Sequence, residues 1–509
     1  MKRLCTLFLA LVLSSVMMAK DFVRISYADR SELEMIFNDS NLTVHYYNNS
    51  EVFATAERFD ANTMVLIDHQ AFEDNEVYTL VYCPQTERLA YLQGKELLFQ
   101  ADEYVIIKGA ALPFKNDGAL TIFNKAAQLP RLTRNFPQVT EENHAIREML
   151  DQVSITTMQE SVQHLQDYGS RLWASDGAYA ASDWIAEQMR SLGLEVEQQP
   201  FELNLGFGGD PAPNVIGIQR GTVYPDTYVV TGCHFDSFTY EALIGLGGAP
   251  GADDNATGVA TVLESARILT PFEFEYSIVY CSFGTEELGL YGSEAYASRC
   301  QQQGMDIIGY FNNDMNGYLR EGDPIHIDCI YPNTVEPIGA FYMNIGSVYF
   351  PEVPIRHVTF SEGDSDHTSF CNHGYMGIFP FEDYENYSPN IHTTNDLIGP
   401  SVNNFENVQQ FCQMNIACLA ECARLHSDAV GEMEIVNAFV YPNPAENQLN
   451  IKAEGLQRIA VYNAIGQLVE TKVADGSHFV LQVGDYAAGL YMVQVVTANG
   501  VATKSVVVK

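Results

Sequence analysis

The side chains best suited to bind a metal ion follow short apolar segments of this chain. The segment Tyr228–Cys233 is uncharged and rich in β-branched residues, and it leads directly into His234. The segment Ser277–Phe283 has the same character and is soon followed by Glu286 and Glu287. Such segments are typical of buried strands in an α/β sheet, and such sheets bind ligands beyond the carboxyl ends of their strands. The sequence therefore predicts that these imidazole and carboxylate groups meet in one crevice.

Three further residues complete a set that would suit metal ions. Asp254 lies in a polar, glycine-bounded segment, Asp314 follows the strand-like run Ile307–Phe311, and His392 lies on a polar loop. Zinc accepts imidazole nitrogen and carboxylate oxygen atoms. One bridging carboxylate, with one histidine and one acid on each side, would hold two ions ~3.5–4 Å apart. Two histidines and three carboxylates are available for this arrangement: His234, Asp254, Glu287, Asp314 and His392.

Each of these motifs also has an ordinary structural interpretation. An acidic pair such as Glu286-Glu287 is usually solvated surface, and a histidine on a loop is usually structural. The segment Asn255–Gly258 has the composition of a turn or a helix start. What favours a functional interpretation is the joint occurrence of five motifs in one chain, which independent surface residues would rarely produce.

The motifs HFDS, GADDNATG, EE, NNDM and IHTTND resemble those of the M28 family of zinc aminopeptidases, of the bacterial leucyl-aminopeptidase type, in order and approximate spacing. The resemblance covers roughly Glu141 to Asp428. It implies an α/β fold of the zinc exopeptidase type, with a mostly parallel central sheet flanked by helices. It also implies two Zn²⁺ ions per chain and peptide substrates with free N-termini.

The resemblance gives each predicted ligand a place. It implies that His234 and Asp314 hold one zinc ion, that Glu287 and His392 hold the other, and that Asp254 bridges the two.

Two further residues receive catalytic roles from the same resemblance. Glu286 would be the general base that takes a proton from the bridging water, and Asp236 would hydrogen-bond and orient the imidazole of His234. A cis peptide bond is implied between Asp254 and Asn255. No metal role is expected for Asp366 or His367, and three histidines outside the motifs are expected to be structural: His326, His357 and His373.

The first 19 residues predict a secretory signal peptide. Lys2-Arg3 precedes the apolar run Leu4–Val16, and small or flexible residues follow up to Ala19. No later segment has the ~18 uninterrupted apolar residues that a transmembrane helix needs. The mature protein is therefore expected outside the cytoplasm.

Residues 20–132 alternate polar and apolar residues in short runs, such as Leu42–Tyr47 and Tyr78–Tyr82. This pattern predicts a small β-rich N-terminal domain without an evident site. We interpret it as a prodomain or accessory domain, with a folding aid and a mobile inhibitory lid as the two alternatives.

Helical spacing of apolar residues begins after that domain and marks a peptidase domain over residues 138–430. It predicts helices within Glu141–Leu150, Met158–Leu165 and Ala181–Arg190. The spacing of Phe405, Val408, Phe411, Cys412, Ile416 and Leu419 predicts the helix that closes the domain.

Residues 434–509 contain short alternating runs separated by turn signals, which predict a small β-sandwich. The YPNPA start, the GLYMVQV run and the end at Lys504–Lys509 resemble the C-terminal sorting domain of the Bacteroidota type IX secretion system. The resemblance implies the secretion machinery as a partner, and a protein that is secreted or on the cell surface after export through the periplasm and outer membrane. Carbohydrate or surface binding is the alternative, although no aromatic platform favours it.

Composition narrows the possible partners. Lys+Arg 27 against Asp+Glu 65 gives a formal net charge of −38, which argues against nucleic acid or an anionic membrane as partner. A negative field would instead attract the free ammonium group of a peptide. Nine cysteines remain of ten once Cys5 of the signal segment is removed. None forms a CxxC motif, which argues against thiolate zinc binding, and Cys233 and Cys281 are expected to be buried thiols.

Three other functions share parts of these motifs. Glutaminyl cyclases share the fold but work with one zinc ion, whereas the full motif set favours two. A carboxypeptidase of the same clan would need a cationic residue for the substrate carboxylate. A non-catalytic surface protein with a peptidase fold would be expected to lose ligands, and this chain keeps all five.

Overall fold

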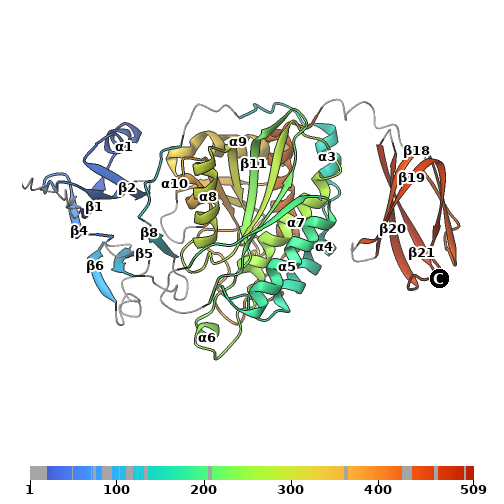
Figure 1. The fold of residues 1–509 in the computed structure, drawn as a ribbon, viewed down its shortest axis with the longest axis horizontal. Coiled ribbons are helices and arrows are strands. Elements are labelled where there is room, and N and C mark those ends of the chain that lie inside the picture. Colours follow the sequence, from blue (N-terminus) through green and yellow to red (C-terminus); the bar gives the residue numbers. More distant parts are fainter. Residues whose placement is uncertain are drawn as a thin grey trace, which may run out of the picture.

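The structure, a computed structural model, describes residues 20–48, 50–69, 71–72, 76–82, 95–101, 104–109, 118–122, 124–130, 136–203, 209–359, 365–426, 438–463, 468–497 and 500–509. The predicted signal peptide lies outside the described residues. Along the chain the structure has a β-rich N-terminal part, a central α/β part and an all-β C-terminal part (Figure 1).

The central part is built on an eight-stranded mixed sheet. Strands β13, β11 and β12 are parallel neighbours, and β16 continues this parallel set. The outer pairs β16–β14, β12–β10 and β10–β9 are antiparallel. The order across the sheet is β15 (Ile355–Val358), β14 (Ile327–Ile330), β16 (Gly377–Phe381), β13 (Asp306–Asn312), β11 (Tyr224–His234), β12 (Tyr276–Phe283), β10 (Asn214–Gln219) and β9 (Glu195–Gln199).

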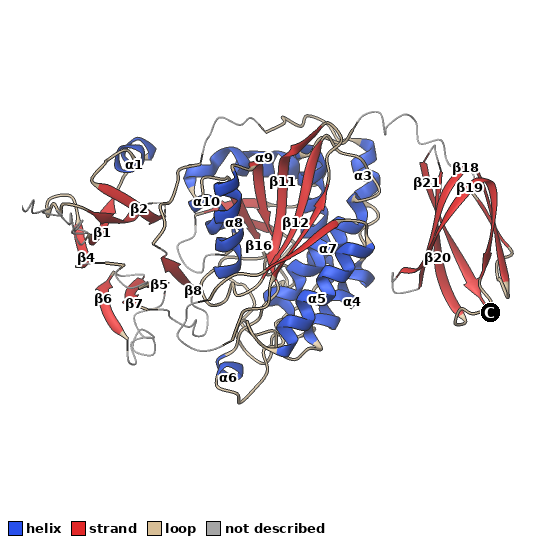
Figure 2. Ribbon diagram, in the orientation of Figure 1, coloured by secondary structure: helices blue, strands red, loops and turns tan. Residues whose placement is uncertain are grey.

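Helices cover both faces of this sheet (Figure 2). One face carries α3 (His144–Leu150), α4 (Ile155–Gln166), α5 (Asp176–Ser191), α7 (Thr257–Leu269), α9 (Glu336–Tyr349) and α11 (Phe405–Cys422). The other face carries α8 (Tyr291–Gln303) and α10 (His367–Asn372). The short α6 (Tyr240–Leu243) lies in the loop that follows β11.

Two buried layers explain why the central strands are apolar without alternation. In β12, Ile278 and Tyr280 belong to the core under α7 and α11, whereas Val279 and Cys281 belong to the core under α8. A strand buried on both faces needs apolar residues at successive positions. The predicted strands and helices of this part are confirmed, and the predicted apolar face of α11 is buried.

The N-terminal part contains two four-stranded antiparallel sheets and the helix α1 (Arg30–Phe37). The first sheet has the order β2 (Leu42–Tyr47), β3 (Glu51–Ala56), β1 (Asp21–Ser26) and β4 (Val65–Asp68). The second has the order β6 (Glu96–Gln100), β7 (Tyr104–Lys108), β5 (Tyr78–Tyr82) and β8 (Gly118–Ile122). The β-rich character predicted for this part is confirmed.

The C-terminal strands form one curled antiparallel sheet, where the sequence predicted a sandwich. Two of the short alternating runs, Leu449–Ile451 and Ile459–Tyr462, belong to one long strand, β18 (Gln448–Asn463), whose register shifts between Lys452 and Arg458. This irregularity lets the strand bend, so a single sheet curls around its own buried core. The other strands are β17 (Phe439–Tyr441), β19 (Leu468–Gln482), β20 (Gly489–Thr497) and β21 (Gly500–Val508).

His45 provides a test of the N-terminal core. Its buried ring has Nδ1 2.9 Å from the Lys125 carbonyl and Nε2 3.0 Å from Thr55 Oγ1, which suits a neutral imidazole. Burial lowers the pKa of His45 from 6.5 to about 4. The unfolded chain therefore binds a proton at higher pH than the folded chain. The stabilisation of the fold by the neutral His45 ring is complete above pH 6.5 and is lost towards pH 4.

We expect the melting temperature to fall between pH 6.5 and pH 4 less steeply for His45→Gln than for wild type. Substitution of the exposed His69 by Gln is the control, and equal slopes for wild type and His45→Gln would contradict the prediction.

Candidate metal centre

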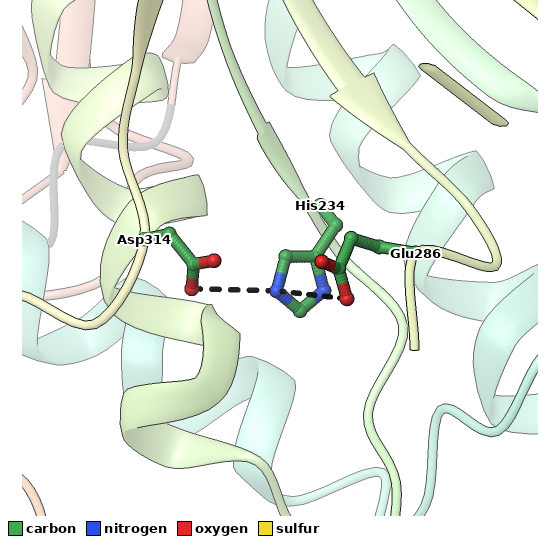
Figure 3. Close-up of side chains that lie close together, drawn as sticks. All are labelled: His234, Glu286 and Asp314. Carbon is green, nitrogen blue, oxygen red and sulfur yellow. Dashed lines mark ion pairs between the residues drawn. The ribbon is translucent and has the colours of Figure 1, made fainter. Parts of the chain in front are cut away.

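Three neighbouring strands deliver the first part of the site. Strand β11 ends at His234, β12 is followed by Glu286 and Glu287, and β13 is followed by Asp314. Because β11 lies between β12 and β13 and is parallel to both, the three carboxyl ends meet at one edge of the sheet. Figure 3 shows the side chains of His234, Glu286 and Asp314 directed toward one another.

His234 is the centre of one group of side chains. Its Nε2 atom lies 3.1 Å from Asp254 Oδ1, 3.3 Å from Asp314 Oδ1 and 3.9 Å from Glu286 Oε2. The imidazole is only 1% exposed. These atoms therefore face a shared space that bulk solvent does not fill.

His392 is the centre of a second group. Its Nε2 atom lies 2.7 Å from Glu287 Oε2 and 3.2 Å from Asp254 Oδ2. The carboxylate of Asp254 thus directs one oxygen to each histidine. The structure brings together all five residues that the sequence suggested as ligands. The peptide bond between Asp254 and Asn255 is cis, as the resemblance implied.

Asp236 lies on the other side of the His234 ring. The Nδ1 atom of His234 is 3.2 Å from the Asp236 backbone carbonyl and 3.4 Å from its Oδ1. The carboxylate also accepts backbone hydrogen bonds from Glu286 at 3.0 Å and from Glu287 at 3.3 Å. Asp236 therefore contacts the imidazole, mainly through its backbone carbonyl, and it also fixes the loop after β12, which the sequence did not indicate.

Three residues at the site have left-handed backbone conformations. The φ angles are 61° at Thr285, 50° at Met315 and 55° at His392. A non-glycine residue in this region costs of order 1–3 kcal/mol, and such residues cluster at functional sites. Thr285 directly precedes Glu286, Met315 directly follows Asp314, and His392 is itself a predicted ligand.

Arg171 is a buried cation behind the site that sequence reasoning missed. Its guanidinium donates hydrogen bonds to the carbonyls of Phe235, Pro250 and Gly251 at 2.7–2.8 Å, and to that of Leu165 at 3.0 Å. It therefore ties the segment after His234 to the segment before Asp254. Burial lowers the pKa of Arg171 to about 10, while nearby carboxylates oppose this shift. No motif or spacing in the sequence marks this residue.

Two more residues support the site, although the sequence analysis gave them no role. Asp396 accepts the backbone N–H groups of Asp253 and Asp254 at 2.9 and 3.1 Å. Ser365 donates its hydroxyl to Asp314 Oδ2 at 2.7 Å. The position of Asp396 shortly after His392 is the signal that would have suggested it.

The carboxylates of the site respond differently to burial. Burial raises the pKa of Glu286 well above its ordinary value, and the nearby carboxylates of Glu287, Asp366 and Asp314 raise it further against the effect of His234. Burial also raises the pKa of Glu287 to about 7. Burial opposes ionisation of Asp254 as well, but the two imidazoles outweigh it and lower its pKa. Of these three carboxylates, Asp254 therefore stays ionised most readily.

The residues present fit a pair of zinc ions. A tetrahedral zinc ion with ligand bonds of ~2.0–2.1 Å sets its ligand atoms about 3.3 Å apart, close to the distances within each group. Glu287 Oε1 and Asp314 Oδ1 are buried and accept no hydrogen bond from the residues that the structure describes. Buried carboxylates need a partner of opposite charge, and a divalent cation supplies one.

The remaining histidines contact other parts of the protein. His357 stacks on Tyr331 with ring centroids 3.8 Å apart, and His373 Nε2 lies 2.9 Å from Glu294 Oε1. His326 lies near Asp328 and Asp383, but Arg356 already pairs with Asp328 at 2.6 Å. These positions agree with the structural roles expected for them.

Comparison with known proteins assigns the central and C-terminal parts. Residues 214–414 match the model of Peptidase family M28, and residues 439–509 match that of the Secretion system C-terminal sorting domain. The chain therefore carries an M28 peptidase domain followed by a sorting domain that indicates export. No helix in the described part of the chain combines the length and apolar character of a membrane span.

Individual relatives agree with this assignment. Leucine aminopeptidase 1 of Chaetomium globosum is 26% identical over 301 residues, covering 55% of this chain and 71% of that protein. Leucine aminopeptidase 1 of Leptosphaeria maculans is 27% identical over 303 residues, covering 57% and 76%. The LapA aminopeptidase of Legionella pneumophila has a similar fold, with a TM-score of 0.55, 18% identity, and coverage of 69% of this chain and 99% of that one.

The position of Asp254 between the two histidines leads to a test of metal binding. Asp254→Asn removes the charge that both groups share, so we expect the purified variant to hold less than half of the wild-type zinc, measured by elemental analysis after dialysis. Asp226→Asn changes an exposed aspartate at the start of β11 and should retain full zinc content. Equal zinc content in the two variants would contradict a shared ligand.

Proposed function

We propose that this chain is a secreted two-zinc aminopeptidase that hydrolyses the first peptide bond of substrates with a free N-terminus. The observation that carries the proposal is the Asp254 carboxylate, with one oxygen directed to His234 and the other to His392. The class of enzyme, a metallo-aminopeptidase, follows from the M28 match and from relatives described as leucine aminopeptidases.

His234 and Asp314 would hold one zinc ion, Glu287 and His392 the other, and Asp254 would bridge them. When bound, two zinc ions polarise the scissile carbonyl and lower the pKa of a water molecule between them. The protein contributes ligands whose loops are already fixed, because Asp236, Asp396 and Ser365 hold them from behind.

Glu286 is the general base in this proposal. Its carboxylate faces the space beside His234 Nε2 but is not needed as a ligand. Burial raises its pKa, which suits a group that must accept a proton near neutral pH and return it. Glu286 takes the proton of the attacking water and delivers it to the amine that leaves.

Apolar residues next to the ligands support a preference for apolar N-terminal side chains. Met315 follows Asp314, and Ile391 precedes His392. Both pack in one cluster with Phe381 and Tyr387. Met315 is buried, whereas the half-buried Ile391 would offer apolar surface to a substrate side chain placed beside His392.

The sorting domain completes the proposal. Its resemblance to type IX domains and its family match support export across the outer membrane, with the secretion machinery as partner. The protein would then act outside the cell or at its surface, on peptides.

A substrate panel tests the reaction. We expect chelator-sensitive release from aminoacyl chromogenic amides with free amino groups, restored by added zinc, and faster release from leucyl than from glutamyl amide. N-blocked amides are the control and should not react. Cyclisation of an N-terminal glutaminyl peptide without amide hydrolysis would replace this proposal with a cyclase, and no reaction despite bound zinc would favour a non-catalytic protein.

The role of Glu286 has its own test. Glu286→Gln keeps the size of the side chain but cannot accept the proton, so kcat should fall by about 10²–10⁴, the usual contribution of general acid–base catalysis. Zinc content and melting temperature should stay at wild-type values. Glu321→Gln, at an exposed turn, is the matched control. Turnover near wild type in Glu286→Gln would rule out this assignment.

A further inference from the structure

The N-terminal domain contacts the peptidase domain next to the loop that carries Glu286 and Glu287. Leu290 follows this loop, and its side chain is only 3% exposed. It is not buried in either core of the central sheet. It belongs instead to the buried cluster of the N-terminal domain, with Phe22, Tyr46, Phe53, Tyr78 and Tyr104 among its members.

The backbone links Leu290 directly to Glu286. The N–H groups of Gly289 and Leu290 both donate to the Glu286 carbonyl at 2.8 Å, and the Tyr291 N–H donates to the Thr285 carbonyl at 3.1 Å. Leu290 has a left-handed conformation, with φ of 64°. The packing of its side chain in the buried cluster of the N-terminal domain can offset the cost of this conformation. A shift of Leu290 would therefore shift the peptide group of Glu286.

Polar contacts flank this apolar one. Lys125 Nζ lies 3.0 Å from Glu294 Oε1, and the same carboxylate bonds to His373. The Gln128 N–H donates to the Asn372 carbonyl at 2.8 Å. Glu294 is 7% exposed, so it would lose a needed partner if the domains separated.

Two further bonds widen the interface. The Tyr47 hydroxyl donates to the Cys371 carbonyl at 3.3 Å, and Arg30 donates to the Thr334 carbonyl at 3.1 Å. The contact thus extends from the start of α8 to the end of α10 and to the segment before α9. Movement of the N-terminal domain as a lid would break all of these contacts.

We propose that the N-terminal domain is a fixed positioning partner of the peptidase domain, and that Leu290 is the positioning residue through which it holds the Glu286-Glu287 loop. The expected effect on turnover rests on the aminopeptidase function proposed above, whereas the effect on the loop itself does not. Leu290 is not one of the proposed ligands or the proposed base, and it acts through the Glu286 peptide group.

The test uses the full chain in four forms: wild type, Leu290→Ala, Leu290→Met and Leu33→Ala. Leu33 is fully buried in the other cluster of the N-terminal domain, so its truncation weakens that domain without touching the loop. In Leu290→Ala we expect kcat to fall about ten- to hundredfold with little change in KM, since misplacement by ~1 Å can cost ~10²-fold. Leu290→Met should restore most of kcat, and Leu33→Ala should lower the melting temperature but not kcat.

Hydrogen exchange gives a second measurement that does not depend on activity. The amides of Gly289 and Leu290 should exchange faster in Leu290→Ala than in wild type, with no such change in Leu33→Ala. If Leu290→Ala does not fold, Glu294→Gln replaces it, because it weakens the same interface and should show the same loss of kcat.

Three results would overturn the proposal. They are unchanged kcat together with unchanged exchange in Leu290→Ala, a higher kcat in that variant, as expected for an inhibitory lid, or equal loss of kcat in Leu33→Ala. Inactive wild type would instead count against the proposed function, and the exchange data would still decide whether Leu290 holds the loop.

Discussion

The burial of several carboxylates in one place is the constraint on which the rest of the structure depends. Asp236, Asp254, Glu287, Asp314 and Asp396 all lie within the peptidase domain with little exposure. Carboxylates at such depth are unstable unless cations and hydrogen-bond donors compensate them. Arg171 supplies one permanent charge, and the two histidines would be free to act as neutral ligands only if metal ions supplied the rest. The arrangement is therefore one that a protein has little reason to keep except to bind cations.

The loops of the site are held by one another. Asp236, on the loop after β11, accepts the N–H groups of the loop after β12. Asp396, on the loop of His392, accepts those of the loop that carries Asp254. Arg171 donates to a carbonyl of the loop after β11 and to one of the loop that carries Asp254, and so ties these two loops together. Since each loop depends on a neighbour, the site is formed as a unit once the sheet brings the strand ends together.

The sequence indicated the proposed ligands because their chemistry is local. A histidine or an acid just beyond an apolar strand can be recognised without knowing the fold. The order of the motifs then gave each of these residues a place in the site. Arg171 could not be found in this way, because its partners are backbone carbonyls far apart in the chain, and any residue type has a carbonyl.

The curled sheet at the C-terminus, where a sandwich was expected, could not be predicted for a similar reason. The bend within β18 depends on pairing with both β19 and β20, which two separate apolar runs do not reveal.

The segment between β12 and α8 is where three requirements meet. It must present Glu286 and Glu287 to the site, start a helix that covers the sheet, and bury Leu290 against the N-terminal domain. Regular structure cannot meet all three within so few residues, so the chain uses left-handed conformations at Thr285 and Leu290, whose cost must be offset by contacts on both sides. Asp236 supplies those contacts from the peptidase side, and the aromatic cluster supplies them from the N-terminal side. A peptidase domain without the contacts to the N-terminal domain would retain every proposed ligand and still lack part of what fixes Glu286, the proposed general base.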